Sequence, residues 1–128
     1  MARILLMIVA ALYGLTAAVM WVAPQTWYDT TPGVAMMGPF SAHFIRDVAL
    51  AFLVSAAALL VGARQNNQPL AIFGAAWPCL HAAFHIWIWL GRGVPVDIPA
   101  VTNLFGIQLP AWLALFAAFR LEPRSSAR

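Results

Sequence analysis

The sequence predicts an all-α integral membrane protein, a single domain folded as an antiparallel four-helix bundle. Its 128 residues are 63% hydrophobic and only 9% charged, whereas soluble domains are roughly 25% charged. A soluble fold of this length could not bury so much apolar surface. Four apolar stretches are each long enough for a helix to cross the hydrocarbon core, which takes about 20 residues. They comprise residues 4–23, 39–63, 69–90 and 98–119.

The first apolar stretch, residues 4–23, is expected to be a transmembrane helix that ends at Pro24. A secretory signal peptide would have a shorter apolar core of about 7–15 residues. Residues 25–38 are rich in Pro, Gly and Thr, and a connection of this length can hold a short surface helix or cover the end of the bundle. Its Trp27 and Tyr28 carry amphipathic rings, which are typical of side chains at the headgroup level.

The second and third stretches each begin at a proline, Pro39 and Pro69, which suits the first turn of a helix. The polar residues 64–68 between them leave room only for a tight turn, so these two helices are expected to be antiparallel neighbours. The fourth stretch follows a turn that contains Gly and Pro, and residues 120–128 form a polar tail.

The arginines predict the topology. The net charge of +3 comes from seven arginines and no lysine. They lie mostly at segment ends, which favours a lipid bilayer over nucleic acid as the partner. Four spans put both termini on one side, and only Arg92 lies in the opposite loops, with Arg46 at a boundary. The positive-inside rule therefore predicts that both termini lie in the cytoplasm. The arginines on the cytoplasmic side are Arg3, Arg64, Arg120, Arg124 and Arg128.

Two polar pairs in the central spans are the main clue to function. His43 and Asp47 in one span, and His81 and His85 in the next, are each four residues apart. On a helix such residues share a face and lie about 6 Å apart along the axis. Ionisable groups in a membrane span are costly and mark functional sites. A rise of about 1.5 Å per residue places both pairs, and Asn103, in the outer half of the bilayer. We therefore expect these groups to converge on one site.

Three imidazoles and a carboxylate form a ligand set that favours zinc, with copper or iron as alternatives. If His43, Asp47, His81 and His85 all bind the metal, the site is closed and structural. If only three bind, the open position holds a water for metal-dependent chemistry on a lipid-soluble substrate. Asn103 would not bind the metal itself but would hydrogen-bond to a ligand and orient it. The last candidate cofactor-binding residue, Arg46, would attract an anionic headgroup or substrate, or extend to the interface.

Other functions fit the same residues. The histidines and Asp47 could instead form hydrogen bonds that join neighbouring helices. The chain would then be a non-catalytic accessory subunit of a larger membrane complex, or part of a homo-oligomer. The polar groups could also line a proton or ligand pathway. A haem is a further alternative, held by His43 together with His81 or His85. The aromatic surroundings suit a porphyrin or a quinone, and equally an interfacial aromatic belt. The single cysteine, Cys79, excludes an internal disulfide and a thiolate-rich metal site.

The layout resembles that of small bacterial membrane proteins of the DoxX-like kind. The matching features are residues 21–24, which end the first span with Trp and Pro, and Arg46 with Asp47 near the start of the second span. The resemblance implies a four-helix membrane fold, and with it we expect a protein of a bacterial inner membrane. Such families have no common assigned activity, so it implies no substrate or cofactor.

Overall fold

The computed structural model describes residues 1–122, and this part of the chain is helical without any β-strand. Four segments are long and apolar enough to cross a membrane, which confirms the predicted all-α class. The predicted span limits lie within a few residues of the observed ones. Arg124 and Arg128, which the topology prediction used, lie outside the described residues. The four segments are α1 (Ala2–Val22), α3 (Ala42–Gln65), α4 (Gln68–Gly91) and the continuous run of α5 (Ile98–Asn103), the π-helix η2 (Leu104–Gln108) and α6 (Leu109–Phe119).

Polar side chains define where the later helices begin. Ser41, Asn67 and Asp97 each accept a hydrogen bond from the backbone N–H three residues further on, which satisfies one of the unpaired N–H groups of a first turn. The second long helix therefore starts after Ser41, and its predicted start at Pro39 was three residues early. The tight turn between α3 and α4 is made by Asn66, whose φ of 52° is left-handed, a conformation that asparagine tolerates better than most residues.

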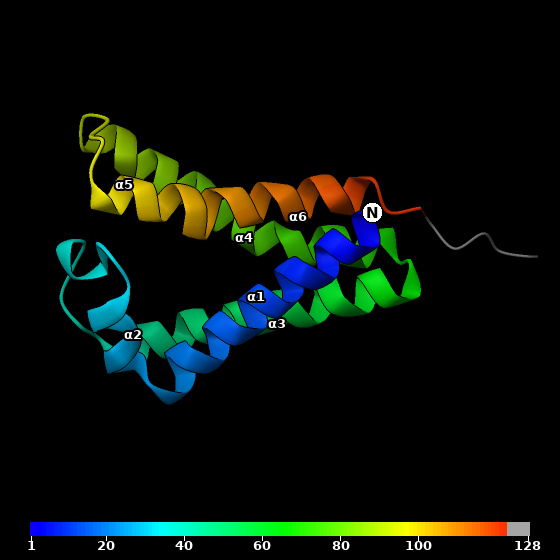
Figure 1. Ribbon diagram of the computed structural model, residues 1–128, viewed down its shortest axis with the longest axis horizontal. Coiled ribbons are helices and arrows are strands. Elements are labelled where there is room, and N and C mark those ends of the chain that lie inside the picture. Colours follow the sequence, from blue (N-terminus) through cyan, green and yellow to red (C-terminus); the bar gives the residue numbers. More distant parts are fainter. Residues whose placement is uncertain (123–128) are drawn as a thin grey trace, which may run out of the picture.

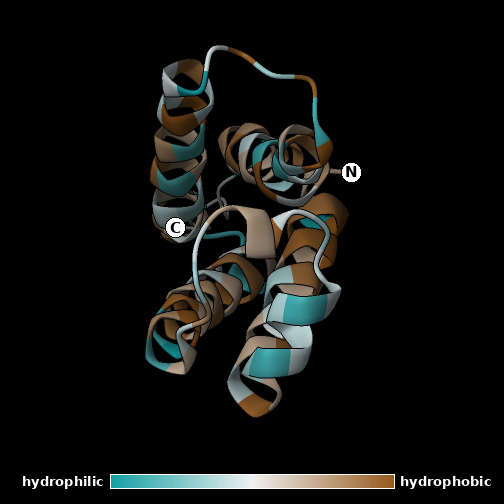
Figure 2. Cartoon of the chain, turned by 90° about the vertical axis from the view of Figure 1, so that its left-hand side faces the viewer, coloured by the Kyte–Doolittle hydropathy of each residue, from teal (hydrophilic) through white to brown (hydrophobic). Residues whose placement is uncertain are grey.

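The long helices form two pairs, α1 with α3 and α4 with α6 (Figure 1). The pairs contact each other through α3 with α4 and through α1 with α6. They lie close together at the end that holds the N-terminus and diverge toward the other end. Viewed from the diverging end, the helices carry apolar residues around much of their circumference (Figure 2). Many large apolar side chains are accordingly exposed on the outer faces.

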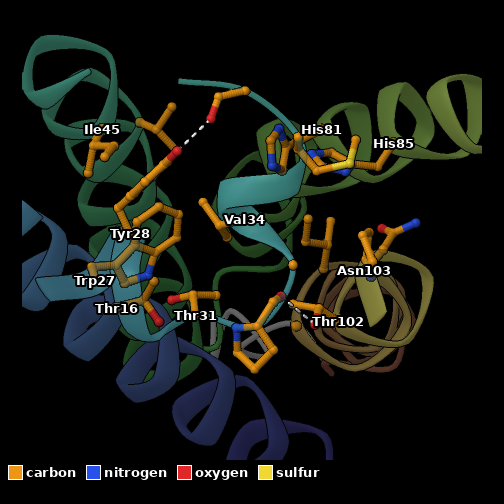
Figure 3. A pocket seen from close by; sticks show the side chains of 18 of the residues that line it. Thr16, Trp27, Tyr28, Thr31, Val34, Ile45, His81, His85, Thr102 and Asn103 are labelled. Carbon is orange, nitrogen blue, oxygen red and sulfur yellow. Dashed lines mark hydrogen bonds between the residues drawn. The ribbon is translucent and has the colours of Figure 1, made fainter. Parts of the chain in front are cut away.

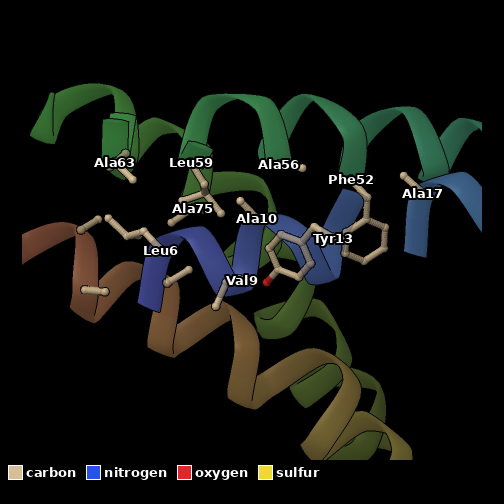
Figure 4. Close-up of a cluster of buried hydrophobic side chains, with 14 of the residues drawn as sticks. Leu6, Val9, Ala10, Tyr13, Ala17, Phe52, Ala56, Leu59, Ala63 and Ala75 are labelled. Carbon is tan, nitrogen blue, oxygen red and sulfur yellow. The ribbon is translucent and has the colours of Figure 1, made fainter. Parts of the chain in front are cut away.

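The core fills the end where the pairs meet and continues along the contact between α1 and α3 as far as Met20 and Ile45 (Figure 4). Leu6 of α1 and Leu59 of α3 are fully buried. Small residues let α3 and α4 approach closely. A Cβ atom on Gly62 would lie 2.8 Å from the backbone nitrogen of Ala71, and one on Gly74 would lie 2.8 Å from that of Leu59. The two backbones are therefore in direct contact.

The connection between α1 and α3 holds α2 (Pro24–Thr30) and the short 3₁₀-helix η1 (Val34–Met36). The prediction of a short helix in this connection is confirmed. The first long helix ends at Val22, and Pro24, expected only to end it, occupies the first position of α2. The segment bends back between the diverging pairs (Figure 1). The hydrogen bond from the Thr102 hydroxyl of α5 to the Pro32 carbonyl, at 2.7 Å, attaches it there. Within the segment, the Tyr28 hydroxyl donates to the Gly38 carbonyl at 2.8 Å.

Candidate binding cleft

A cleft of about 470 Å³ lies where the two helix pairs diverge. This volume is within the range of pockets that hold small molecules, about 300–1,000 Å³. Its lining is mostly apolar and comes from α1, α3, α4, α5 and η2, with the α2–η1 segment closing one side. Figure 3 shows the polar side chains of His81, His85 and Asn103 along the wall formed by α4 and α5. The cleft is therefore a mostly apolar volume with polar groups on the α4–α5 wall, and Thr16, Tyr28 and Thr31 line it from the opposite side (Figure 3).

His81 and His85 project from one face of α4, with ring centroids 4.6 Å apart. The His81 ring also stacks on Trp77 at a centroid distance of 4.9 Å and meets Phe52 of α3 edge-on. Both imidazoles are half-buried and line the cleft. Within residues 1–122 neither ring forms a hydrogen bond with another residue. A neutral imidazole offers one donor and one acceptor nitrogen, so both rings can bind a molecule in the cleft.

Asn103 lines the cleft from the end of α5 and is connected to a buried network below it. The Gln108 amide nitrogen donates to the Asn103 side-chain oxygen at 3.0 Å and to the Ala82 carbonyl of α4 at 2.8 Å. The Trp112 indole nitrogen donates to the Gln108 side-chain oxygen at 3.0 Å. The π-helix favours this contact, because its i→i+5 hydrogen bonds widen the turn and bring positions 103 and 108 closer to the same face than an α-helix would.

The α2–η1 segment reaches α5 through a glycine. Gly33 has a φ of +84° and its missing Cβ would lie 2.9 Å from the Cα and backbone nitrogen of Pro99. Only glycine adopts this conformation without cost and leaves room for the Pro99 backbone. The close approach brings Pro32 within hydrogen-bonding distance of Thr102, so the segment covers the cleft against α5 (Figure 3).

Arg92 is the one charged side chain among the described residues that line the cleft. It lies just beyond α4 and forms an ion pair with Asp97, which begins α5. The hydrogen bond from Arg92, followed by the one from the Ala100 backbone N–H, lowers the pKa of the Asp97 carboxyl below its ordinary value of 3.8. Asp97 is therefore ionised at neutral pH and balances the arginine charge.

The structure does not bring His43 and Asp47 to the cleft. Their side chains form a pair, with 3.3 Å between Nε2 and Oδ2, but they are 90% and 60% exposed. Each is two residues from the buried Ile45, which places both about 200° around the helix from that face. Across residues 1–122, no three His, Cys, Asp or Glu side chains lie close enough to hold a metal ion. The sequence predicted that the His43–Asp47 pair and the His81–His85 pair lie at a similar depth along their helices. The two pairs are nevertheless apart, because they point in different directions around the axes of α3 and α4.

Arg46 also lies away from the cleft. Its Nε donates to the backbone carbonyl of Trp21, near the end of α1, at 3.3 Å. The guanidinium is thereby bonded to a carbonyl left unpaired at the end of α1. Of the six predicted site residues, the cleft collects His81, His85 and Asn103.

The sequence analysis missed the roles of Gly33, Thr102, Gln108 and Trp112. Gln108 follows Asn103 by five residues, which in an α-helix separates two side chains by about 140°. Nothing in α-helical spacing pairs them, and a π-helix has no clear sequence signal. For Gly33, the Thr-Pro-Gly sequence of residues 31–33 indicated a turn, but not the contact that the turn makes.

Comparison with known proteins found no matching protein family, curated protein or solved structure. The resemblance to DoxX-like proteins stays a prediction.

Proposed function

We propose that this chain is a multi-pass membrane protein that binds a lipid-soluble molecule in the cleft. One observation carries the proposal. The 470 Å³ cleft is mostly apolar, but His81, His85 and Asn103 face it along one wall without using all their hydrogen-bonding capacity. Such pockets orient an apolar molecule through a small number of polar contacts.

The proposed setting is a bilayer crossed by the four long helices as an antiparallel bundle. Their length, their apolar composition and the large apolar side chains on their outer faces support it. Arg3, Arg64 and Arg120 lie at the helix ends near the N-terminus (Figure 1). Arg46, which bonds to the end of α1, and Arg92 lie toward the diverging end. This asymmetry supports cytoplasmic termini in a bacterial inner membrane, with the cleft in the outer half. In a Cys79→Ala background, single cysteines at the exposed Arg64 or Arg92, labelled in intact cells by an impermeant maleimide, test it. Labelling at position 64 and not at 92 would reverse the topology.

The lining favours a ligand with a flat apolar body. Trp27, Phe84 and Trp89 line the cleft together with Phe52 and Phe105. Aromatic side chains pack against planar ligands in offset or edge-on arrangements. A substituted quinone combines such a body with polar oxygens, and it quenches the fluorescence of nearby indoles.

The test is a titration of the detergent-purified protein with decyl-1,4-benzoquinone, followed by tryptophan fluorescence. We expect saturable quenching. Ala100 lines the cleft, whereas the adjacent Val101 is exposed on the same helix and does not line it. Ala100→Phe should fill part of the cleft and weaken binding at least tenfold, and Val101→Phe should leave it unchanged. Equal, linear quenching in all three proteins would mean simple partitioning and would refute the proposal. Co-purifying subunits would then favour an accessory role.

A transition-metal ion is a second candidate ligand. The observation that favours it is the pair of imidazoles with ring centroids 4.6 Å apart, neither of them hydrogen-bonded within the described chain. Histidines four residues apart on a helix can hold zinc or copper when water or a bound molecule supplies the other ligands. Elemental analysis of wild type, His81→Ala and His43→Ala tests this. Metal that is lost in His81→Ala and retained in His43→Ala supports a site at the α4 pair. Equal metal content in all three proteins refutes it.

A further inference from the structure

The buried network behind Asn103 fixes which hydrogen-bonding group this side chain presents. Three bonds connect Trp112, Gln108, Asn103 and the Ala82 carbonyl. An indole N–H can only donate and a backbone carbonyl can only accept. Both ends therefore require the same orientation of the Gln108 amide, with its oxygen toward Trp112 and its nitrogen toward Ala82. Gln108 is buried, so water does not compete for these positions.

The orientation of the Gln108 amide determines the orientation of the Asn103 amide. The Gln108 nitrogen also faces Asn103, and the facing atom must accept, so it is the side-chain oxygen, at 3.0 Å. Turning the Asn103 amide over would bring two N–H groups against each other. The Asn103 amide nitrogen is left with two N–H donors and no hydrogen-bond partner within the described chain. For a molecule in the cleft, Asn103 therefore offers a donor.

The charge of the cleft narrows the ligand further. Arg92 is the charged lining residue, and its ion pair with Asp97 balances it. A carboxylate or phosphate would lose its hydration in this apolar volume without gaining an unpaired cation, which is costly. A neutral oxygen that accepts a hydrogen bond avoids this cost.

We infer that the cleft recognises a neutral carbonyl oxygen on its lipid-soluble ligand, which accepts a hydrogen bond from the Asn103 amide nitrogen. Gln108 acts as the positioning residue that holds this amide in its orientation, and Trp112 fixes the orientation of Gln108. The inference rests on the proposed binding function and adds the chemical class of the group that is recognised. Ketones, quinones and amides share this acceptor, and the network itself does not distinguish them.

The test compares three probes with the same alkyl chain by native mass spectrometry of the protein in detergent. Decyl-1,4-benzoquinone carries only acceptors, 4-decylphenol carries a donor, and decylbenzene carries no polar group. One net hydrogen bond corresponds to about fivefold in affinity, so wild type should prefer the quinone to decylbenzene by about that factor. Asn103→Leu should abolish this preference while decylbenzene still binds, which shows that the variant is folded.

Asn103→Asp is the sharper variant. When ionised, the new carboxyl only accepts hydrogen bonds, so it keeps the bond from Gln108 but offers no donor to the ligand. Because an apolar site favours the protonated form, which still donates, the preference should reverse toward 4-decylphenol only as the pH is raised and the carboxyl ionises. An unchanged quinone preference in Asn103→Leu, or its absence in wild type, overturns this inference alone. Failure of all three probes to bind wild type overturns the proposed function and this inference with it. A further comparison uses a 2-alkanone and the n-alkane of the same chain length. If the protein prefers the ketone by the same factor as it prefers the quinone to decylbenzene, it recognises a carbonyl group in general.

Discussion

The contact between Gly33 and Pro99 predicts that Gly33→Ala detaches the α2–η1 segment from the cleft. Alanine at a φ of +84° adopts the left-handed region at a cost of roughly 1 kcal/mol. Its Cβ would also lie 2.9 Å from the Pro99 Cα, whereas carbon atoms pack at about 3.5–4.0 Å. The neighbour is backbone, so the segment itself must shift.

The magnitude follows from what the shift breaks. To bring the new Cβ to an ordinary van der Waals distance from Pro99, the segment must move away from α5. This movement lengthens the 2.7 Å hydrogen bond from Thr102 to the Pro32 carbonyl, which contributes about 1 kcal/mol. Together with the backbone strain, the covered cleft is disfavoured by about 2 kcal/mol, and the dissociation constant of a ligand that needs the cover should rise about 30-fold. The melting temperature should change little, because neither Gly33 nor Pro99 belongs to the hydrophobic core.

The assay is the quinone titration of the purified protein, with Gly38→Ala as the matched control. Gly38 lies in the same segment, but a Cβ there would meet nothing within 4 Å, and its carbonyl still accepts the hydrogen bond from Tyr28. Gly38→Ala should bind within about twofold of wild type. If Gly33→Ala binds as tightly as Gly38→Ala, the segment does not cover the ligand and the argument fails.

Two further predictions concern stability. Gly74→Ala should destabilise the protein by about 1–2 kcal/mol in denaturant titrations, because overpacking against the α3 backbone costs more than the helix propensity gained. Gly91→Ala is the control, since a Cβ there meets nothing within 4 Å, and it should be neutral or stabilising. Equal effects of the two substitutions would contradict the backbone contact. The lowered pKa of Asp97 means that its pairing with Arg92 stabilises the fold above the ordinary pKa of 3.8 and that this contribution is lost as the pH falls through the lowered pKa. Asp97→Asn should therefore be less stable than wild type at pH 7 and converge with it in acid, and a constant difference down to pH 2 would refute the assignment.

The sequence was sufficient for the four long helices because length and apolar composition are local properties. It was not sufficient for how each helix is rotated about its axis. A soluble helix shows its buried face as an apolar stripe, but α3 is apolar on its outer face as well, with Leu50, Leu53 and Val54 exposed. Hydrophobicity alone therefore does not show that His43 lies on the exposed face of α3 and Ile45 on its buried face.

The α4 histidines were located correctly within their span, and their exposure to a cleft was not predictable from spacing alone. The cleft exists because the helix pairs diverge and the α2–η1 segment turns back between them. That return depends on a long-range contact, from Gly33 to Pro99. Contacts between residues so far apart in the chain leave no periodic pattern in a single sequence.

The π-helix has a consequence for changes in chain length. A π-turn is an α-helix that has absorbed one extra residue. Removing one residue from Leu104–Gln108 would restore the α-helical repeat and still leave Asn103 and the glutamine on one face, now four residues apart. Gly106 is exposed, with nothing near its missing Cβ. This helix should therefore accept a one-residue deletion at position 106, whereas the same deletion within α3 or α4 would rotate half of a closely packed face by about 100°.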